Sequence, residues 1–180
     1  NLCDMIIGVS NKPKDTQGLL RKLKENALKS IDTVKDRVTD FNLYNEENIN
    51  IFSHLDFLED YLKPYFKAAV GNYKITMDAK KEFLNSNLNI NKISELMNSH
   101  HNYLKEDLKI TTPEIDKMID ICFKNGAISS KIVGSGGGGS IVSLSTNSTS
   151  SNKIVSELKS VGAKDAFIAR KGRGPTIYYE

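Results

Sequence analysis

Residues 128–144 read ISSKIVGSGGGGSIVSL, a glycine-dense run between two apolar segments. Residues 128–133 alternate between polar and apolar before turning apolar, and residues 141–144 do much the same. Such short β-prone segments predict strands, each of which needs a core to pack against. A flexible Gly/Ser linker would instead join the polar ends of domains. The run therefore predicts a loop that connects two strands of one domain.

A glycine-dense loop between strands has two physical properties. It allows a positive φ at consecutive residues, and its backbone N–H groups can approach a ligand with no Cβ in the way. Concave arrays of N–H groups bind phosphates and other oxyanions. A linker or plain tight turn is the alternative, as is a loop whose glycines only permit close packing. The candidate phosphate- and substrate-binding residues are Gly134, Ser135, Gly136, Gly137, Gly138, Gly139 and Ser140.

Length and composition fit one soluble globular domain. The 180 residues are 39% hydrophobic and 26% charged, and the net charge of +3 is too small to indicate nucleic acid. No apolar run approaches the length of a membrane span, and no secretory signal is present, so we expect no membrane association and a cytoplasmic location. Because a strand-like run begins almost at residue 1 without an initiator Met, we expect a fragment that lacks an upstream portion.

Apolar spacing predicts a strand that ends near Ser10 and later strands at 128–133, 141–144, 165–169 and 176–179. Between them it predicts helices. The first predicted helix begins at Thr16 and continues, with a weaker pattern, to Tyr44. The remaining predicted helices cover 45–62, 68–84, 93–108, 112–126 and roughly 147–161. Pro64 interrupts the pattern after the second helix. Thr112-Pro113-Glu114 is a strong helix start, because Thr caps, Pro needs no N–H in the first turn and Glu meets the positive helix end.

The order of these elements indicates the fold. One strand, several helices, two strands, one helix and two more strands, with at least one hairpin, favour an antiparallel sheet with helices packed on one face. We therefore predict an α+β, ferredoxin-like sandwich with a helical insertion, formed by residues 1–180 as one domain.

Residues 126–140 resemble the late glycine motif of the GHMP kinases, G-A-x-x-x-K-x-x-G-x-G-G-G-G, with a helix before it and a strand after it. Residues 96–100, LMNSH, and 113–116, PEID, resemble galactokinases most within that family, whereas the all-glycine loop is closer to mevalonate kinases. The resemblance covers nearly the whole chain and implies the C-terminal domain of a kinase that transfers a phosphoryl group from ATP, with Mg²⁺, to a small-molecule hydroxyl, most simply that of a sugar.

The resemblance also implies what this chain lacks. The main ATP loop and the catalytic Asp of the family belong to its N-terminal half, which is the expected partner, so we assign no catalytic residue and no metal ligand here. This chain alone is expected to be inactive as a kinase. Two other classes stay open: a regulatory module that senses an anionic metabolite, and a structural or RNA-binding domain, although the late strands show no aromatic stripe.

Other polar residues have simpler explanations. Lys131 either adds charge near a phosphate or faces solvent from an alternating strand. His100 is expected at the edge of the core, and adjacent His100 and His101 point too far apart on a helix to share one ion. Cys3 and Cys122 are expected to be buried free thiols of a reducing compartment. Phe66, Tyr73 and Phe83 are expected in the core.

Overall fold

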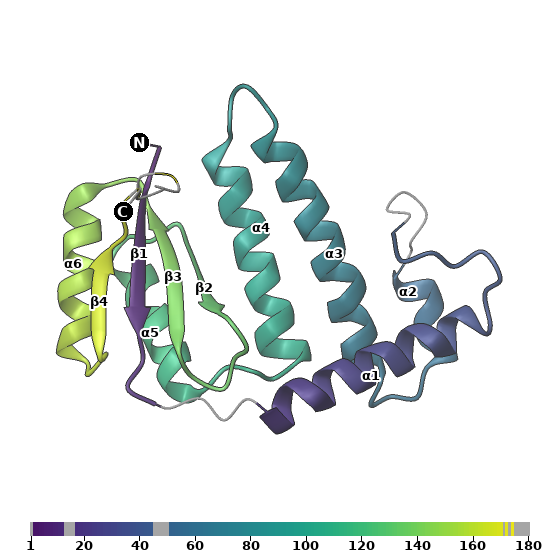
Figure 1. The fold of residues 1–180 in the computed structure, drawn as a ribbon. Helices are drawn as coiled ribbons and strands as arrows, with labels where there is room; N and C mark the ends of the chain where they lie inside the picture. Colours follow the sequence, from purple (N-terminus) through teal and green to yellow (C-terminus); the bar gives the residue numbers. More distant parts are fainter. Residues whose placement is uncertain (1, 13–16, 45–50, 171, 173, 175–180) are drawn as a thin grey trace, which may run out of the picture.

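The computed structural model describes residues 2–12, 17–44, 51–170, 172 and 174 (Figure 1). Its sheet has four antiparallel strands: β1 (Asp4–Val9), β2 (Ser129–Val133), β3 (Ser140–Ser145) and β4 (Asp165–Ile168). Their order in the sheet is β2-β3-β1-β4. With helices between β1 and β2 and between β3 and β4, this is the ferredoxin-like topology, which confirms the predicted α+β class. The expected strand at 176–179 lies outside the described residues.

Helices α5 (Pro113–Lys124) and α6 (Ser148–Ser160) cover one face of the sheet, behind the strands in Figure 1. Their apolar stripes pack against Ile6, Ile132 and Ile141, all fully buried, to form the main core. Thr112 caps α5 as predicted, because its Oγ1 accepts the N–H of Ile115 at 3.3 Å. The buried face of α5 is also the one predicted: Ile115, Met118, Ile119 and Cys122.

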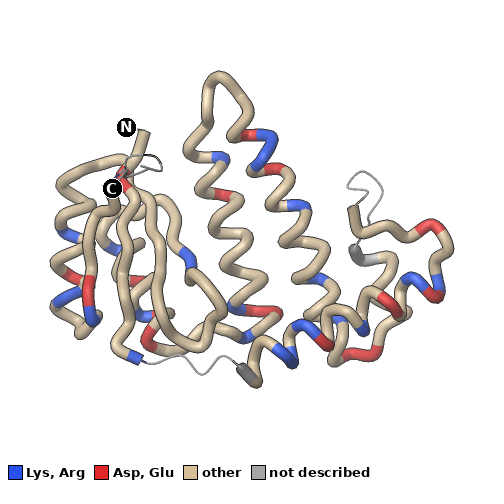
Figure 2. The backbone as a smooth tube through the Cα atoms, viewed as in Figure 1, with Lys and Arg blue, Asp and Glu red and all other residues tan. Residues whose placement is uncertain are grey.

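The long segment between β1 and β2 carries the helical insertion. It contains α1 (Gln17–Lys35), a short α2 (Ile51–His54), α3 (Lys63–Phe83) and α4 (Ile90–Asn102), which continues into a π-helical turn, Tyr103–Asp107. Around Phe66 the insertion has a second core, separate from the one under the sheet. Figure 2 shows that charges of both signs are mixed along α1 and α3, whereas the strands carry few.

Helix α4 lies beside the sheet rather than on its face, next to the edge strand β2 (Figure 1). The Asn98 amide joins the two: its Nδ2 donates to the carbonyl of Ile128 at 3.3 Å, and its Oδ1 accepts the N–H of Ser130 at 3.2 Å. An exposed edge strand presents unpaired backbone groups. Asn98 therefore satisfies the free edge of β2 and fixes the position of the insertion relative to the sheet.

Some expected details of the insertion are wrong. Residues 58–62 are not helical, although a helix was expected over 45–62, of which 45–50 lie outside the described residues. Pro64 does not interrupt a helix but stands in the first turn of α3, where a missing N–H has no consequence. Phe83 is 63% exposed rather than in the core, because α3 extends past the sheet. Apolar residues do recur at helical spacing in these segments, but this spacing does not specify where a helix begins.

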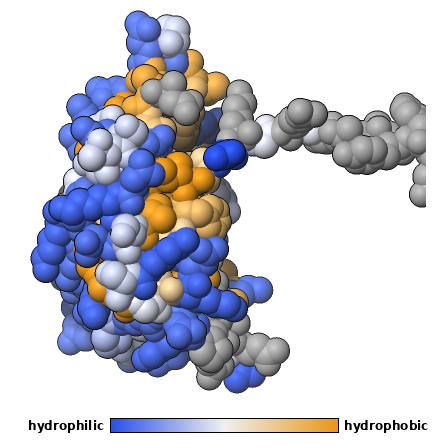
Figure 3. Space-filling view, turned by 90° about the vertical axis from the view of Figure 1, so that its left-hand side faces the viewer, coloured by the Kyte–Doolittle hydropathy of each residue, from blue (hydrophilic) through white to orange (hydrophobic). Residues whose placement is uncertain are grey.

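The second face of the sheet is only partly covered: Ser129 and Leu144 on this face are buried, and Ser129 contacts Met97 of α4, but other side chains on it are exposed. Strand register places Met5, Phe167 and Val133 on this face, and each is between 39% and 47% exposed. Figure 3, viewed from the side of α6 and β4, shows hydrophobic surface among hydrophilic residues. In the described residues, no helix combines the length and the apolar character that crossing a membrane requires.

Candidate functional site

The glycine run forms the loop that connects β2 to β3 at one end of the sheet. Its backbone uses the conformational freedom that the sequence predicted. All five of its glycines have a positive φ, between 69° and 123°: Gly134, Gly136, Gly137, Gly138 and Gly139. Side chains with a Cβ rarely adopt this conformation, so the shape of the loop depends on glycine at these positions.

Two neighbouring segments hold the loop in place. The N–H of Gly137 donates to the carbonyl of Ile110 at 2.8 Å, and the N–H of Gly139 donates to Ser10 Oγ at 3.1 Å. Ser10 in turn donates its own N–H to the carbonyl of Gly139 at 2.6 Å. A Cβ added at Gly136 would lie 2.7 Å from Ile110 Cβ and 2.8 Å from Ile110 O. Close packing is therefore one demonstrated role of these glycines.

Other N–H groups of the loop remain available. Those of Gly134, Ser135, Gly136 and Gly138 meet no acceptor in the part of the chain that the structure describes. Gly136 and Gly138 are buried residues. Because buried backbone N–H groups are nearly always paired, donors without a protein acceptor are suited to bind an oxyanion. The loop thus combines fixed anchors with free donors.

The start of α5 lies at the same end of the molecule as the glycine loop. Ile110, which holds Gly137, lies just before the Thr112 cap, and Glu114 in the first turn accepts the N–H of Asn11 at 2.8 Å. The end of β1, the glycine loop and the beginning of α5 are therefore joined by hydrogen bonds. Sequence reasoning did not single out Ser10 or Ile110 as supports of the loop. Their role depends on strand order, which places residue 10 beside residue 139.

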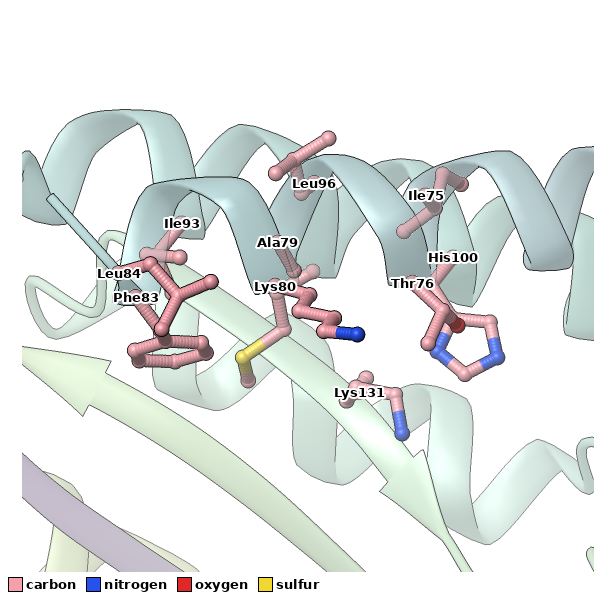
Figure 4. A pocket seen from close by; sticks show the side chains of 11 residues that line it. Ile75, Thr76, Ala79, Lys80, Phe83, Leu84, Ile93, Leu96, His100 and Lys131 are labelled. Atoms are coloured by element: carbon pink, nitrogen blue, oxygen red, sulfur yellow. The ribbon is translucent and has the colours of Figure 1, made fainter. Parts of the chain in front are cut away.

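Lys131 lies elsewhere than expected. It is half-buried on β2 and faces a groove between α3 and α4, together with His100 and Thr76 (Figure 4). Its Nζ donates to the carbonyl of Ile132 at 2.9 Å, and burial lowers the pKa of its ammonium group. Lys131 is therefore not a fully solvent-exposed residue of the strand, and it lies on β2 before the glycine loop begins.

The histidines and cysteines show no shared metal site. His100 is half-buried, as expected for a residue at the edge of the core, and burial together with the charge of Lys131 lowers its pKa to about 4. His101 is buried, and burial also lowers its pKa. Cys122 is buried and free as predicted, whereas Cys3 is free but only half-buried. No group of three or more potential metal ligands occurs among the described residues.

The comparisons with known proteins agree with this arrangement. Residues 80–164 match the family model described as GHMP kinases C terminal. This segment includes α4, α5, the glycine loop and α6. These residues are thus similar to the C-terminal domain of the GHMP kinases. The matched residues contain β2, β3, the glycine loop between them and the start of α5, whereas β1 and β4 lie outside the match.

Relatives of this chain include galactokinases. The galactokinase of Clostridium perfringens strain SM101 is 28% identical over 159 residues, which span 82% of this chain and 39% of that protein. The galactokinase of Dictyostelium discoideum is 39% identical over 59 residues, 33% of this chain and 12% of that protein. The chain therefore spans less than half the length of these relatives.

Solved structures share the fold. The crystal structure of Lactococcus lactis galactokinase complexed with galactose aligns with a TM-score of 0.81 at 23% identity, over 98% of this chain and 47% of that one. The L. major mevalonate kinase in complex with R-mevalonate aligns with a TM-score of 0.57 at 19% identity, over 92% and 41% of the two chains. The helical insertion is thus part of the shared fold, since nearly all of this chain aligns with the galactokinase.

Proposed function

We propose that residues 1–180 are the C-terminal lobe of an ATP-dependent small-molecule kinase, most simply a galactose-type sugar kinase. The glycine loop carries the proposal, since it combines anchored glycines with N–H donors that have no acceptor among the described residues. The GHMP family match of residues 80–164 and the galactokinase relatives support it. An N-terminal half would supply most nucleotide contacts and the catalytic acid or base.

In this proposal the loop acts by electrostatics. Phosphoryl transfer from ATP to a hydroxyl develops charge on the transferring group, and fixed N–H donors aimed at that charge stabilise the transition state. The donors of Gly136 and Gly138 are the best placed, because the bonds of Gly137 to Ile110 and of Gly139 to Ser10 hold them without further reorganisation. Mg²⁺ would neutralise charge on the phosphates of ATP. No cluster of acidic or other ligands for it exists among the described residues, so we assign no step through it here.

Two members of the family suggest different acceptor substrates for the phosphoryl group. A mevalonate-type kinase is the alternative, because the all-glycine loop resembles that group more closely. The test is ATP consumption by the full-length protein with galactose, other hexoses, mevalonate and homoserine offered separately. Turnover with galactose and not with mevalonate supports the sugar kinase, and the reverse supports the alternative. A folded protein that binds ATP but turns over none of these acceptors would be a kinase with another substrate, and a folded protein that does not bind ATP would favour the regulatory anion sensor.

A substitution within the loop tests its role in the reaction. Gly138→Val adds a branched side chain where φ is 123°, whereas Gly162→Val does so at a φ of 94° in an exposed turn after α6. We expect Gly138→Val to lower kcat at least about tenfold, since misplacing an oxyanion donor typically costs that or more. Gly162→Val should keep the activity of the folded fraction. Equal kcat values for the two variants would show that the loop has no part in the chemistry.

A further inference from the structure

A second cavity lies away from the glycine loop. Helices α3 and α4 run side by side, and the groove between them and β2 encloses about 570 Å³. Figure 4 shows Phe83 and Leu84 at one end of this groove, and Thr76 and His100 at the other, with Lys131 reaching in from β2. Its volume lies within the range of small-molecule sites in proteins. The kinase proposal uses none of these residues.

The wall of the groove is strongly apolar. Phe83 and Leu84 are 63% and 77% exposed, and Met97, Leu96 and Ile93 continue the same surface on α4. Single exposed apolar residues are ordinary, but a contiguous hollow of aliphatic and aromatic side chains marks a binding surface more often than not. This wall would accept a hydrocarbon chain.

The polar end carries an uncompensated positive charge. The only acceptor of the Lys131 ammonium among the described residues is the carbonyl of its neighbour Ile132, and none of the lining residues is acidic. No carboxylate lies within ion-pair distance of Lys131 in the described part of the chain. Partly buried charges are ordinarily paired. A bound anion would pair with the ammonium group of Lys131 at this end of the groove.

The protonation state of His100 determines how much positive charge the groove offers to such an anion. With its pKa lowered to about 4 by burial and by Lys131, the imidazole is neutral near pH 7 and offers a hydrogen bond rather than a second charge. Lys80 also lines the groove, but it is exposed on α3, where solvent screens its charge. One half-buried cation beside a neutral imidazole matches a monoanion such as a carboxylate better than a doubly charged phosphate.

We propose that the groove between α3 and α4 binds a long-chain carboxylate, with the carboxylate at Lys131 and His100 and the hydrocarbon along Met97, Leu96 and Phe83. Thr76 lies beside the carboxylate, but its hydroxyl donates to the carbonyl of Asn72 at 2.7 Å. The site is separate from the glycine loop and does not require that the protein be a kinase. Charge complementarity selects this occupant, because the groove joins an apolar wall to Lys131, the one half-buried cation among its lining residues. A groove built for another protein segment would not need that cation unpaired.

The test is a titration of the full-length protein with cis-parinaric acid, a fatty acid whose fluorescence rises in apolar sites. We expect saturable binding, displacement by laurate, and at least about tenfold weaker displacement by dodecanol, which has the same chain without the charge, since a charge-assisted hydrogen bond is worth this much. Lys131→Met should weaken laurate binding about tenfold and remove the preference over dodecanol. Lys131→Arg should keep it.

Two further variants make the result specific. Lys74→Met removes an exposed lysine of α3 that does not line the groove, and it should bind laurate like the wild type. Ala79→Phe fills the groove from α3 and should abolish binding of both the acid and the alcohol. Thermal unfolding of each variant verifies that it is folded.

Three results would overturn the proposal: no saturable binding by the folded wild type, equal displacement by laurate and dodecanol, or the same laurate affinity in Lys131→Met and Lys74→Met. The first would also be the outcome if another part of the protein covers the groove. Because the readout is binding rather than ATP turnover, failure here leaves the kinase proposal untouched, and an inactive protein can still bind the fatty acid.

Discussion

The glycine loop and the groove between α3 and α4 both involve β2, but they are built in opposite ways. The shape of the loop comes from the backbone, since its glycines have positive φ and its contacts to Ile110 and Ser10 are mainly backbone hydrogen bonds. The shape of the groove comes from side chains that three separate elements contribute. A backbone-built site is visible as a sequence motif, whereas a site built by side chains becomes visible only when the elements are assembled.

Among the variants that test this difference, Gly136→Val is expected to have the largest effect. Its Cβ would meet Ile110 at 2.7 Å, and its φ of 81° is unfavourable for a branched residue. We expect the free energy of unfolding to fall by about 3 kcal/mol or more, measured by urea denaturation. Gly162→Ala is the control, because it has a φ of 94° with nothing within 4 Å of the added Cβ, and about 1 kcal/mol is expected there. Equal losses would mean that Ile110 moves aside and that the loop is not tightly packed.

Asn98→Ala tests whether the groove depends on the attachment of α4 to the sheet. The variant loses both hydrogen bonds to the edge of β2, and about 2 kcal/mol of stability should be lost with them. Asn102→Ala, at an exposed position of the same helix, should change stability little. If the two variants unfold at the same urea concentration, the edge of β2 is satisfied in some other way.

Ser10→Ala removes the side-chain anchor of the loop. The N–H of Gly139 loses its acceptor, which should lower the free energy of unfolding by about 1 kcal/mol. The same change should speed amide hydrogen exchange at Gly139 more than at Gly137, whose bond to Ile110 is independent of Ser10. Unchanged exchange at Gly139 would show that the loop keeps its shape without this anchor.

The smallest expected effect is a pH dependence from the groove. The pKa of His100 is lowered from 6.5 to about 4, so the unfolded state binds more protons between these values. Stability should therefore fall as the pH drops from 6.5 towards 4, by less than about 1 kcal/mol once solvent screening of this half-exposed group is allowed for. His100→Gln should flatten that slope only in part, because the pKa of His101 is lowered too.

NMR titration can check the cause of this shift. Lys131→Met removes the positive charge that contributes to it, so the pKa of His100 should rise in that variant. An unchanged pKa would show that burial alone sets it. That result would also place the ammonium group of Lys131 further from the imidazole than the groove requires.

Much of the fold could be predicted from the sequence because its signals are local. The Thr112-Pro113-Glu114 helix start, the buried stripe of α5 and the glycine loop with its two strands need only residues close together in the chain. The expected helix over 45–62 failed beyond Phe57 for the same reason. Apolar residues such as Leu58 and Leu62 have helical spacing, but they pack as a turn against Phe66 in the second core.

The sequence by itself determined the order of the four described strands along the chain, the glycine loop and its positive φ, and the resemblance to the GHMP kinases. Only the tertiary structure decided that Ser10 and Ile110 anchor that loop, that Asn98 covers the edge of β2, and that Lys131 faces a groove with His100. The physical reason is that backbone conformation depends on each residue and its neighbours. Contacts between side chains distant in sequence depend on how the sheet and the insertion pack together.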